Sequence, residues 1–183
     1  HAVGAEMYAD LLSAELGRRQ GRPEEPGEAP VALDLEVDAF LPESYLPGET
    51  DRLDYYKRIL KSDRGQAERI KKELQDLCGP LPEPVCLLFR ILEARSLAAR
   101  ARVRRVTQRE GFLELIFLPE TEIGPATTQS WLQTYAARLR FIRRPDGEGV
   151  AVELRGEEPL AWLEAFLLKL VGTKSGKNDT MTK

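Results

Sequence analysis

Two carboxylates, Glu73 and Asp76, stand three residues apart in a segment whose apolar spacing predicts a helix. Residues three apart lie on one side of a helix, so the two acids can meet a single cationic surface. They fall in the last turns, where the negative end of the helix dipole disfavours a carboxylate by about 0.3–1 kcal/mol. One interpretation is a docking spot for an arginine of a partner. The other, commoner on spacing alone, is a solvated face in which Arg69 pairs with Glu73 and Lys72 with Asp76.

Arginines are the second group of side chains that could do chemistry, because they cluster on two predicted pairs of strands. They stand at positions 100, 102, 104, 105 and 109, and again at 138, 140, 143 and 144. Residues four apart on a strand share a face, so Arg140 and Arg144 would lie together, opposite Phe141. With Arg104 and Arg105 they could form a basic strip that contacts phosphates or an acidic protein. We favour the plainer interpretation, in which the charges keep sheet edges soluble.

The sequence matches no common enzymatic template. No G-x-x-x-x-G-K-[ST] segment, the loop that cradles phosphate, occurs. The single histidine is His1, so nucleophile arrangements that use a histidine lack their base. Cys78 and Cys86 lack C-x-x-C spacing, and we expect two reduced, packed thiols. We therefore expect no catalytic, cofactor-binding or metal-binding residue in this chain.

The composition is that of a globular protein, with 183 residues, of which 42% are hydrophobic and 31% charged. The net charge of −3 argues against a dedicated nucleic-acid-binding domain, because such domains are usually basic. No apolar run approaches the roughly 20 residues that span a bilayer, and the first residues lack the pattern of a secretion signal. We expect a cytoplasmic protein without a membrane partner.

The predicted elements indicate an α/β protein of the α+β type, with helices packed on a small, mostly antiparallel sheet. Gly79 ends the helix that carries the two acids, and Pro82 and Pro84 open the next one. Alternating apolar residues predict a strand over 31–37, and the order strand–strand–helix then occurs twice after the helices. The expected helices are 51–60, 66–78, 82–101, 127–135 and 158–171, and the later strands are 103–108, 112–118, 139–144 and 150–155.

The same spacing predicts which side chains are buried and which residues cap the helices. Leu77 should continue the apolar stripe of Ile70 and Leu74, and Phe141 should face the core. Residues 145–149 are expected to form the turn of the last hairpin. The expected helix caps are Thr50 or Asp51 for the first helix and Thr127 or Thr128 for the one that buries Trp131, Leu132 and Tyr135.

Composition divides the chain into four parts. Residues 1–17 read as a short amphipathic connecting helix, and residues 18–30, rich in Gly, Pro and charge, as an exposed linker. Residues 31–172 carry all the other apolar periodicity and form the expected folded domain. Residues 173–183 have no apolar anchor and are expected to be disordered.

Three segments occur in a specific order: LPESYLP at 41–47, RLDYYKRI at 52–59 and ELQDLCGPLPEPV at 73–85. Together they resemble the C-terminal domain of the bacterial transcription-repair coupling factor family, and residues 1–8 resemble the start of the long helix that leaves that family's DNA motor. The resemblance fades after about residue 100. It also fails at Leu77 and Cys78, where the family usually has Arg and Phe, so any role of that arginine is absent here.

The resemblance implies a non-catalytic regulatory domain that begins in the middle of a larger protein. That parent would be an ATP-dependent double-stranded DNA translocase of helicase superfamily 2, using ATP and Mg, which removes stalled RNA polymerase and recruits nucleotide excision repair. The domain would fold back on an N-terminal UvrB-like module and mask its UvrA-binding surface. Glu73 and Asp76 occupy the family's acidic positions, so the implied role of both is to pair with arginines of that module.

Two further expectations complete the hypothesis. The isolated chain is expected to be a monomer. The alternative function is a nucleic-acid-binding module that uses the arginine-rich hairpins, with Arg104, Arg105, Arg140 and Arg144 as its contacts.

Overall fold

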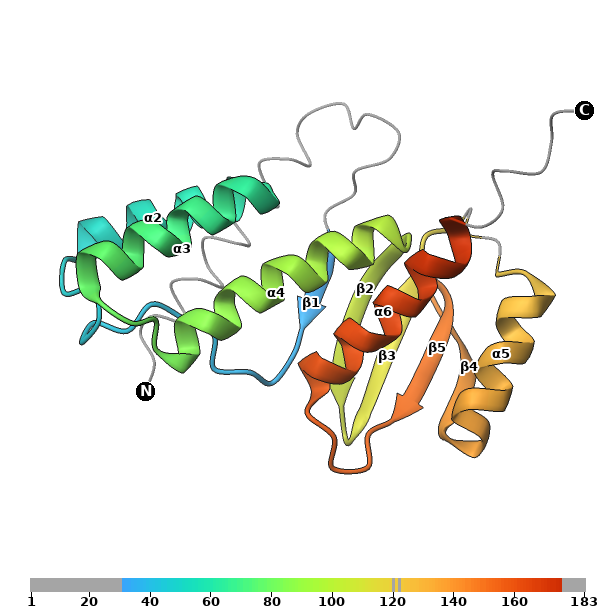
Figure 1. The fold of residues 1–183 in the computed structure, drawn as a ribbon. Helices are drawn as coiled ribbons and strands as arrows, with labels where there is room; N and C mark the ends of the chain where they lie inside the picture. The colour runs from blue at the N-terminus through green and yellow to red at the C-terminus, as the bar shows by residue number, and fades with distance from the viewer. Residues whose placement is uncertain (1–30, 120, 122, 176–183) are drawn as a thin grey trace, which may run out of the picture. The chain divides into compact units, whose positions relative to one another are not determined.

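The computed structural model describes residues 31–119, 121 and 123–175 (Figure 1). The predicted connecting helix and linker, and the chain after 175, lie outside these residues. The described part falls into two compact units, one of residues 37–93 and one of residues 31–36 with 94–175. The predicted domain limits at 31 and 172 stay a prediction.

The first unit is helical. It contains α2 (Glu49–Lys61), α3 (Arg64–Cys78) and the first part of α4 (Glu83–Arg100). Side chains from all three helices are buried in its core, among them Tyr56, Leu74 and Leu88, each with 0% exposure. Asp63 begins α3 with a capping box. Its side chain accepts from the backbone N–H of Gln66, and the Gln66 side chain accepts from the backbone N–H of Asp63.

Several sequence expectations for this unit need correction. Gly48, and neither Thr50 nor Asp51, is the N-cap of α2. Leu77 is 65% exposed, because Ile70 and Leu74 already fill the buried side of α3 and Leu77 stands past it at the helix end. Cys86 is exposed and Cys78 only half-buried, so the two free thiols are not both packed as expected. Gly79 does end α3, at φ 85°, as its position predicts.

The second unit is built on a five-stranded sheet. Its strands are β1 (Ala32–Asp34), β2 (Val103–Arg109), β3 (Phe112–Phe117), β4 (Leu139–Arg144) and β5 (Gly147–Glu153), in the order β1-β2-β3-β5-β4. β1 runs parallel to β2, and all other neighbours are antiparallel. The predicted α/β class with a mostly antiparallel sheet is therefore confirmed.

Helices α5 (Pro125–Tyr135) and α6 (Pro159–Ser175) complete this unit, with the 3-10 turn η1 (Ala136–Arg138) between α5 and β4. Figure 1 shows α6 crossing one face of the sheet. The rings of Phe117 and Trp131 stack 6.1 Å apart, and Trp131 lies 5.4 Å from Phe166, which joins β3, α5 and α6. The predicted α6 stripe of Leu160, Leu163, Leu167 and Leu170 is buried.

The sheet register separates three of the strand arginines from the covered face. Val106 pairs with Leu115 and Leu115 with Val150, all buried, so these define the covered face. Arg105, Glu114, Arg140 and Arg144 belong to the opposite set of alternating residues. The prediction that Arg140 and Arg144 share a face, opposite Phe141, is confirmed.

The structure also corrects details of this unit. β1 has only three residues, and the last hairpin turns on Pro145 and Asp146 alone. α5 begins at Pro125 after the N-cap Gly124, ahead of Thr127 and Thr128. Phe141 is 52% exposed because β4 is the edge strand, and Leu132 is 47% exposed. Helix α6 runs to Ser175, past the end expected at 171.

Candidate functional site

Tyr45 closes the C-terminal end of α3. Its hydroxyl lies 3.0 Å from the carbonyl oxygen of Leu74 and 2.8 Å from that of Gly79. Gly79 is the C-cap residue, so its carbonyl has no donor within the helix, and the Tyr45 hydroxyl supplies one. Burial raises the pKa of Tyr45, which keeps the phenol protonated as that donor. The first motif segment therefore caps the helix of the third.

The loop before α2 is fixed by side chains of α2 itself. Arg52, only 8% exposed, donates to the carbonyl oxygens of Leu46 at 2.7 Å and Pro47 at 2.8 Å. The backbone N–H of Leu41 donates to the hydroxyl oxygen of Tyr56 at 2.7 Å. Buried polar groups need such partners. The first and second motif segments thus hold each other in place.

Glu73 has its partners on α2. Arg58 donates from both terminal guanidinium nitrogens, at 2.9 Å to Oε1 and 2.5 Å to Oε2, and the Tyr55 hydroxyl donates to Oε1 at 2.8 Å. These charge-assisted bonds lower the pKa of Glu73 to about 2. The expected pairing with Arg69 is therefore wrong, since a bidentate partner from a neighbouring helix has better geometry than one on the same helix.

Asp76 differs from Glu73 in its surroundings. It is exposed, and among the described residues no hydrogen bond or ion pair involves its carboxylate, so the expected pair with Lys72 is wrong as well. The last turn of α3 contains no basic residue. Leu77, beside it, is the exposed leucine already noted. We call Glu73, Asp76 and Leu77 the α3 acidic end.

The four predicted basic contacts do not form one free strip. Arg105 binds both carboxylate oxygens of Asp146, at 3.0 and 3.1 Å, and Arg144 binds both of Glu114. The Arg140 guanidinium carbon lies 5.3 Å from the centre of the Phe112 ring. Arg104 lies 3.5 Å from the backbone oxygen of Asp146. Because two of the four charges are neutralised locally, the geometry weakens the nucleic-acid interpretation.

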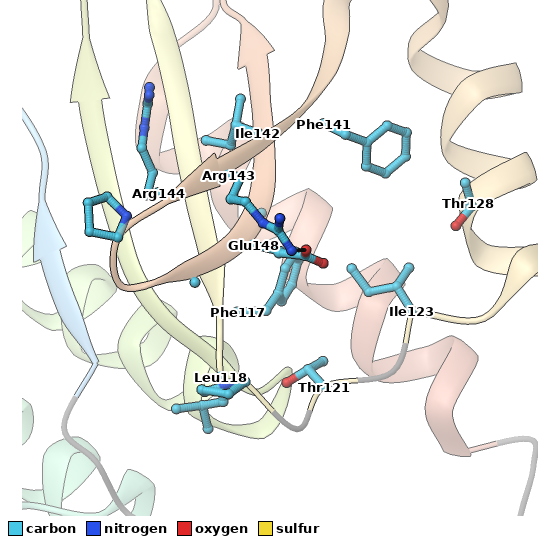
Figure 2. Close-up of a pocket in the computed structure, with 14 residues that line it drawn as sticks. Phe117, Leu118, Thr121, Ile123, Thr128, Phe141, Ile142, Arg143, Arg144 and Glu148 are labelled. Carbon is cyan, nitrogen blue, oxygen red and sulfur yellow. Dashed lines mark hydrogen bonds and ion pairs between the residues drawn. The ribbon is translucent and has the colours of Figure 1, made fainter.

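A groove that the sequence did not indicate lies between the end of β4 and the start of α5 (Figure 2). Its volume is about 810 Å³, and its walls include Phe117, Ile123, Thr128, Phe141 and Arg143. Arg143 pairs with Glu148 at 2.6 Å beside it. The sequence signal for this groove is an aromatic residue on a strand rich in arginine, and the prediction that Phe141 faces the core is wrong.

Neither a metal site nor a membrane span is found in the described part of the chain. Within 31–119, 121 and 123–175, no three His, Cys, Asp or Glu side chains gather as a metal site would require. No helix among these same residues has the length and apolar character to cross a bilayer.

The comparisons with known proteins agree on one family. The model of the TRCF domain matches residues 35–128. The transcription-repair-coupling factor of Bacillus subtilis is 23% identical over 184 aligned positions, which cover 99% of this chain and 16% of that protein. The factor of Escherichia coli is 25% identical, covering 92% and 15%, and that of Haemophilus influenzae is 31% identical, covering 76% and 13%.

A solved structure shares the fold. The crystal structure of the C-terminal domain of a transcription-repair coupling factor superposes with a TM-score of 0.62 at 21% identity, covering 81% of this chain and 96% of that one. The chain spans about a sixth of the Bacillus subtilis relative and somewhat less of the other two. By its matching domain model, this chain belongs to the transcription-repair coupling factor family.

Proposed function

We propose that this chain is a non-catalytic regulatory domain that binds another part of its parent protein through the α3 acidic end. The observation that carries the proposal is Asp76, an exposed carboxylate at the negative end of a helix with no cation among the described residues. A partner arginine at this point would offset the unfavourable dipole interaction of about 0.3–1 kcal/mol. Leu77, beside it, would add apolar contact at the same surface.

Glu73 contributes in a different way. Its carboxylate already binds Arg58 and Tyr55, yet 46% of the side chain is exposed, and Oε2 accepts only from Arg58 among the contacts described. A second arginine could therefore approach Oε2 without displacing the first. In this proposal Glu73 fixes α2 against α3 and presents one free carboxylate edge, while Asp76 supplies the unpaired charge.

The proposed partner is taken from the resemblance to the family. The relatives are named transcription-repair-coupling factors, so we propose that this domain docks on an N-terminal UvrB-like module and masks the surface that recruits UvrA. Release would accompany engagement of double-stranded DNA and stalled RNA polymerase by an ATP-dependent motor. A few exposed charge pairs suit such a latch, because they set specificity while leaving the affinity low enough to open.

The test uses Asp76→Lys, which reverses the charge without touching the Arg58–Glu73 pair. Its matched control is Asp54→Lys, the same change at an exposed position of α2. Binding of the chain to the separately produced UvrB-like module is followed by calorimetry at about 0.1 M salt. We expect Asp76→Lys to weaken binding about five- to tenfold and the control to change it less than twofold.

The same variant placed in the parent protein should raise UvrA binding. Equal affinities of Asp76→Lys, Asp54→Lys and the unaltered chain for the module would remove the α3 acidic end from the interface.

A further inference from the structure

Strand β4 leaves one edge of the sheet open. It is the last strand in the order β1-β2-β3-β5-β4 (Figure 1). The two-residue turn closes on the pair Arg144–Gly147, so hydrogen-bonded pairs alternate from there along the ladder. The backbone groups of Phe141 and Arg143 consequently point away from β5, and among the described residues neither forms a further backbone hydrogen bond. An incoming strand could pair with them.

The groove described above runs beside this open edge. Figure 2 shows the Phe141 side chain directed toward α5, with Ile123 and Thr128 on the opposite wall. The half-exposed Phe141 ring makes this wall apolar. A strand edge flanked by an apolar groove and a helix is the arrangement in which extended peptides add to a sheet and insert alternate side chains into a pocket.

The positive charge of β4 favours an acidic partner strand. Its six residues, LRFIRR, contain three arginines and no acid. Arg140 lies on the face opposite Phe141 and has no carboxylate partner among the described residues. An added strand whose apolar side chains face Phe141 would therefore place its carboxylates beside Arg140. Pairing of β4 with β4 of a second copy would bring arginines together, which is unfavourable across strands.

We infer that β4 is a docking edge for an extended acidic segment of a protein, which adds as a sixth strand and inserts an apolar side chain into the groove beside Phe141. This surface lies in the sheet unit and uses backbone pairing, so it is distinct from the α3 acidic end. It does not depend on the function proposed above.

The probe is an eight-residue peptide of alternating glutamate and valine, and its control alternates lysine and valine. The ¹⁵N-labelled 183-residue chain is titrated with each. We expect the glutamate peptide to shift the amide signals of Phe141 and Arg143, and the lysine peptide to shift neither. Arg140→Glu, on the face that the glutamates would occupy, should weaken binding about tenfold, whereas Arg109→Glu, the same change at the exposed end of an inner strand, should alter it less than twofold.

Two variants at position 141 separate backbone from side chain. Phe141→Ala and Phe141→Pro both remove the ring, but only proline removes the outward N–H, and no ladder bond is lost. The Phe141→Pro variant should bind the glutamate peptide about fivefold more weakly than the Phe141→Ala variant does.

Three results would overturn the inference. The first is equal binding of the two peptides, or no shift at β4. The second is that a duplex DNA of about 20 base pairs shifts the β4 amides more strongly than the glutamate peptide. The third is that these amides shift with protein concentration alone, which would assign the edge to a second copy. If Phe141→Pro fails to fold, Arg140→Glu still decides.

Discussion

Replacing Glu73 by glutamine tests the packing of α2 against α3, because it removes the charge but keeps the size and an oxygen for the Tyr55 hydroxyl. Lowering the pKa from 4.5 to about 2 would stabilise the fold by about 3 kcal/mol if the pair were shielded from water. However, 40% of Arg58 and 46% of Glu73 are exposed. Exposed ion pairs contribute about 0.2–1 kcal/mol to the free energy of unfolding. The bidentate geometry favours the upper end of this range, so we expect Glu73→Gln to destabilise the fold by about 1 kcal/mol.

The pH dependence has a definite sign. A carboxylate whose pKa is lower in the folded chain stabilises the fold above its unfolded-state pKa and loses that contribution as the pH falls. For Glu73 the loss extends from about pH 4.5 to about pH 2. The unaltered chain should therefore be about 1 kcal/mol more stable than Glu73→Gln at pH 7, and the two should converge near pH 2.

Urea unfolding followed by circular dichroism at pH 7, 4, 3 and 2 measures this difference, because the other titrating groups are common to both proteins. Glu68→Gln is the control, since the ion-pair partner of Glu68 among the described residues is Lys71, one turn away on the same helix. This variant should change stability by less than about 0.5 kcal/mol. A double-mutant cycle with Arg58→Gln should recover most of the Glu73 effect as coupling. A coupling of zero, or a difference that stays constant from pH 7 to 2, would refute the reasoning.

Two further predictions concern the fold. Tyr45→Phe removes the donor to the Leu74 and Gly79 carbonyls and should lower the free energy of unfolding by about 1 kcal/mol in urea, whereas unchanged stability would mean that water caps α3 equally well. Gly149→Ala would place a Cβ 2.0 Å from the Leu115 carbonyl oxygen and should destabilise by about 3 kcal/mol or more in thermal unfolding. Its control Gly172→Ala meets nothing within 4 Å on helix α6 and should stabilise by about 0.5 kcal/mol, so similar melting temperatures for the two variants would contradict this account.

Local pattern was enough to predict most of the elements. Gly79 and the prolines that follow it limited α3 and α4, and alternation located β2 to β5 within a few residues, because these signals act within one element. The burial of side chains at the ends of helices and strands was harder to predict. Leu77 continues a helical spacing and Phe141 a strand spacing, yet both are largely exposed, since exposure depends on whether another element covers that end. No single segment contains that information.

The partners of the charged residues also escaped prediction for a physical reason. Spacing suggests only pairs within one helix or strand, such as Arg69 with Glu73. The observed partners come from other parts of the chain. Arg58, the partner of Glu73, is 15 residues away in the sequence, and Asp146, the partner of Arg105, is 41 residues away. Bidentate geometry requires two backbones at a fixed distance, which only the folded chain provides. The helix that carries the two acids was thus predicted correctly, whereas the partner of Glu73 was not.

These contacts change which residue can test the docking hypothesis. A residue in a family motif can serve folding, binding or both, and Tyr45 and Glu73 each have a partner within the fold that accounts for their chemistry. Loss of partner binding in a Glu73 variant would be ambiguous, because loosening α2 from α3 also disturbs the surface they share. Asp76 has no such internal role among the described residues, so a loss of binding at Asp76 with unchanged stability can arise only at the interface. The two carboxylates that spacing placed together are therefore separable, because Glu73 holds the two helices together and Asp76 alone can test the docking proposal.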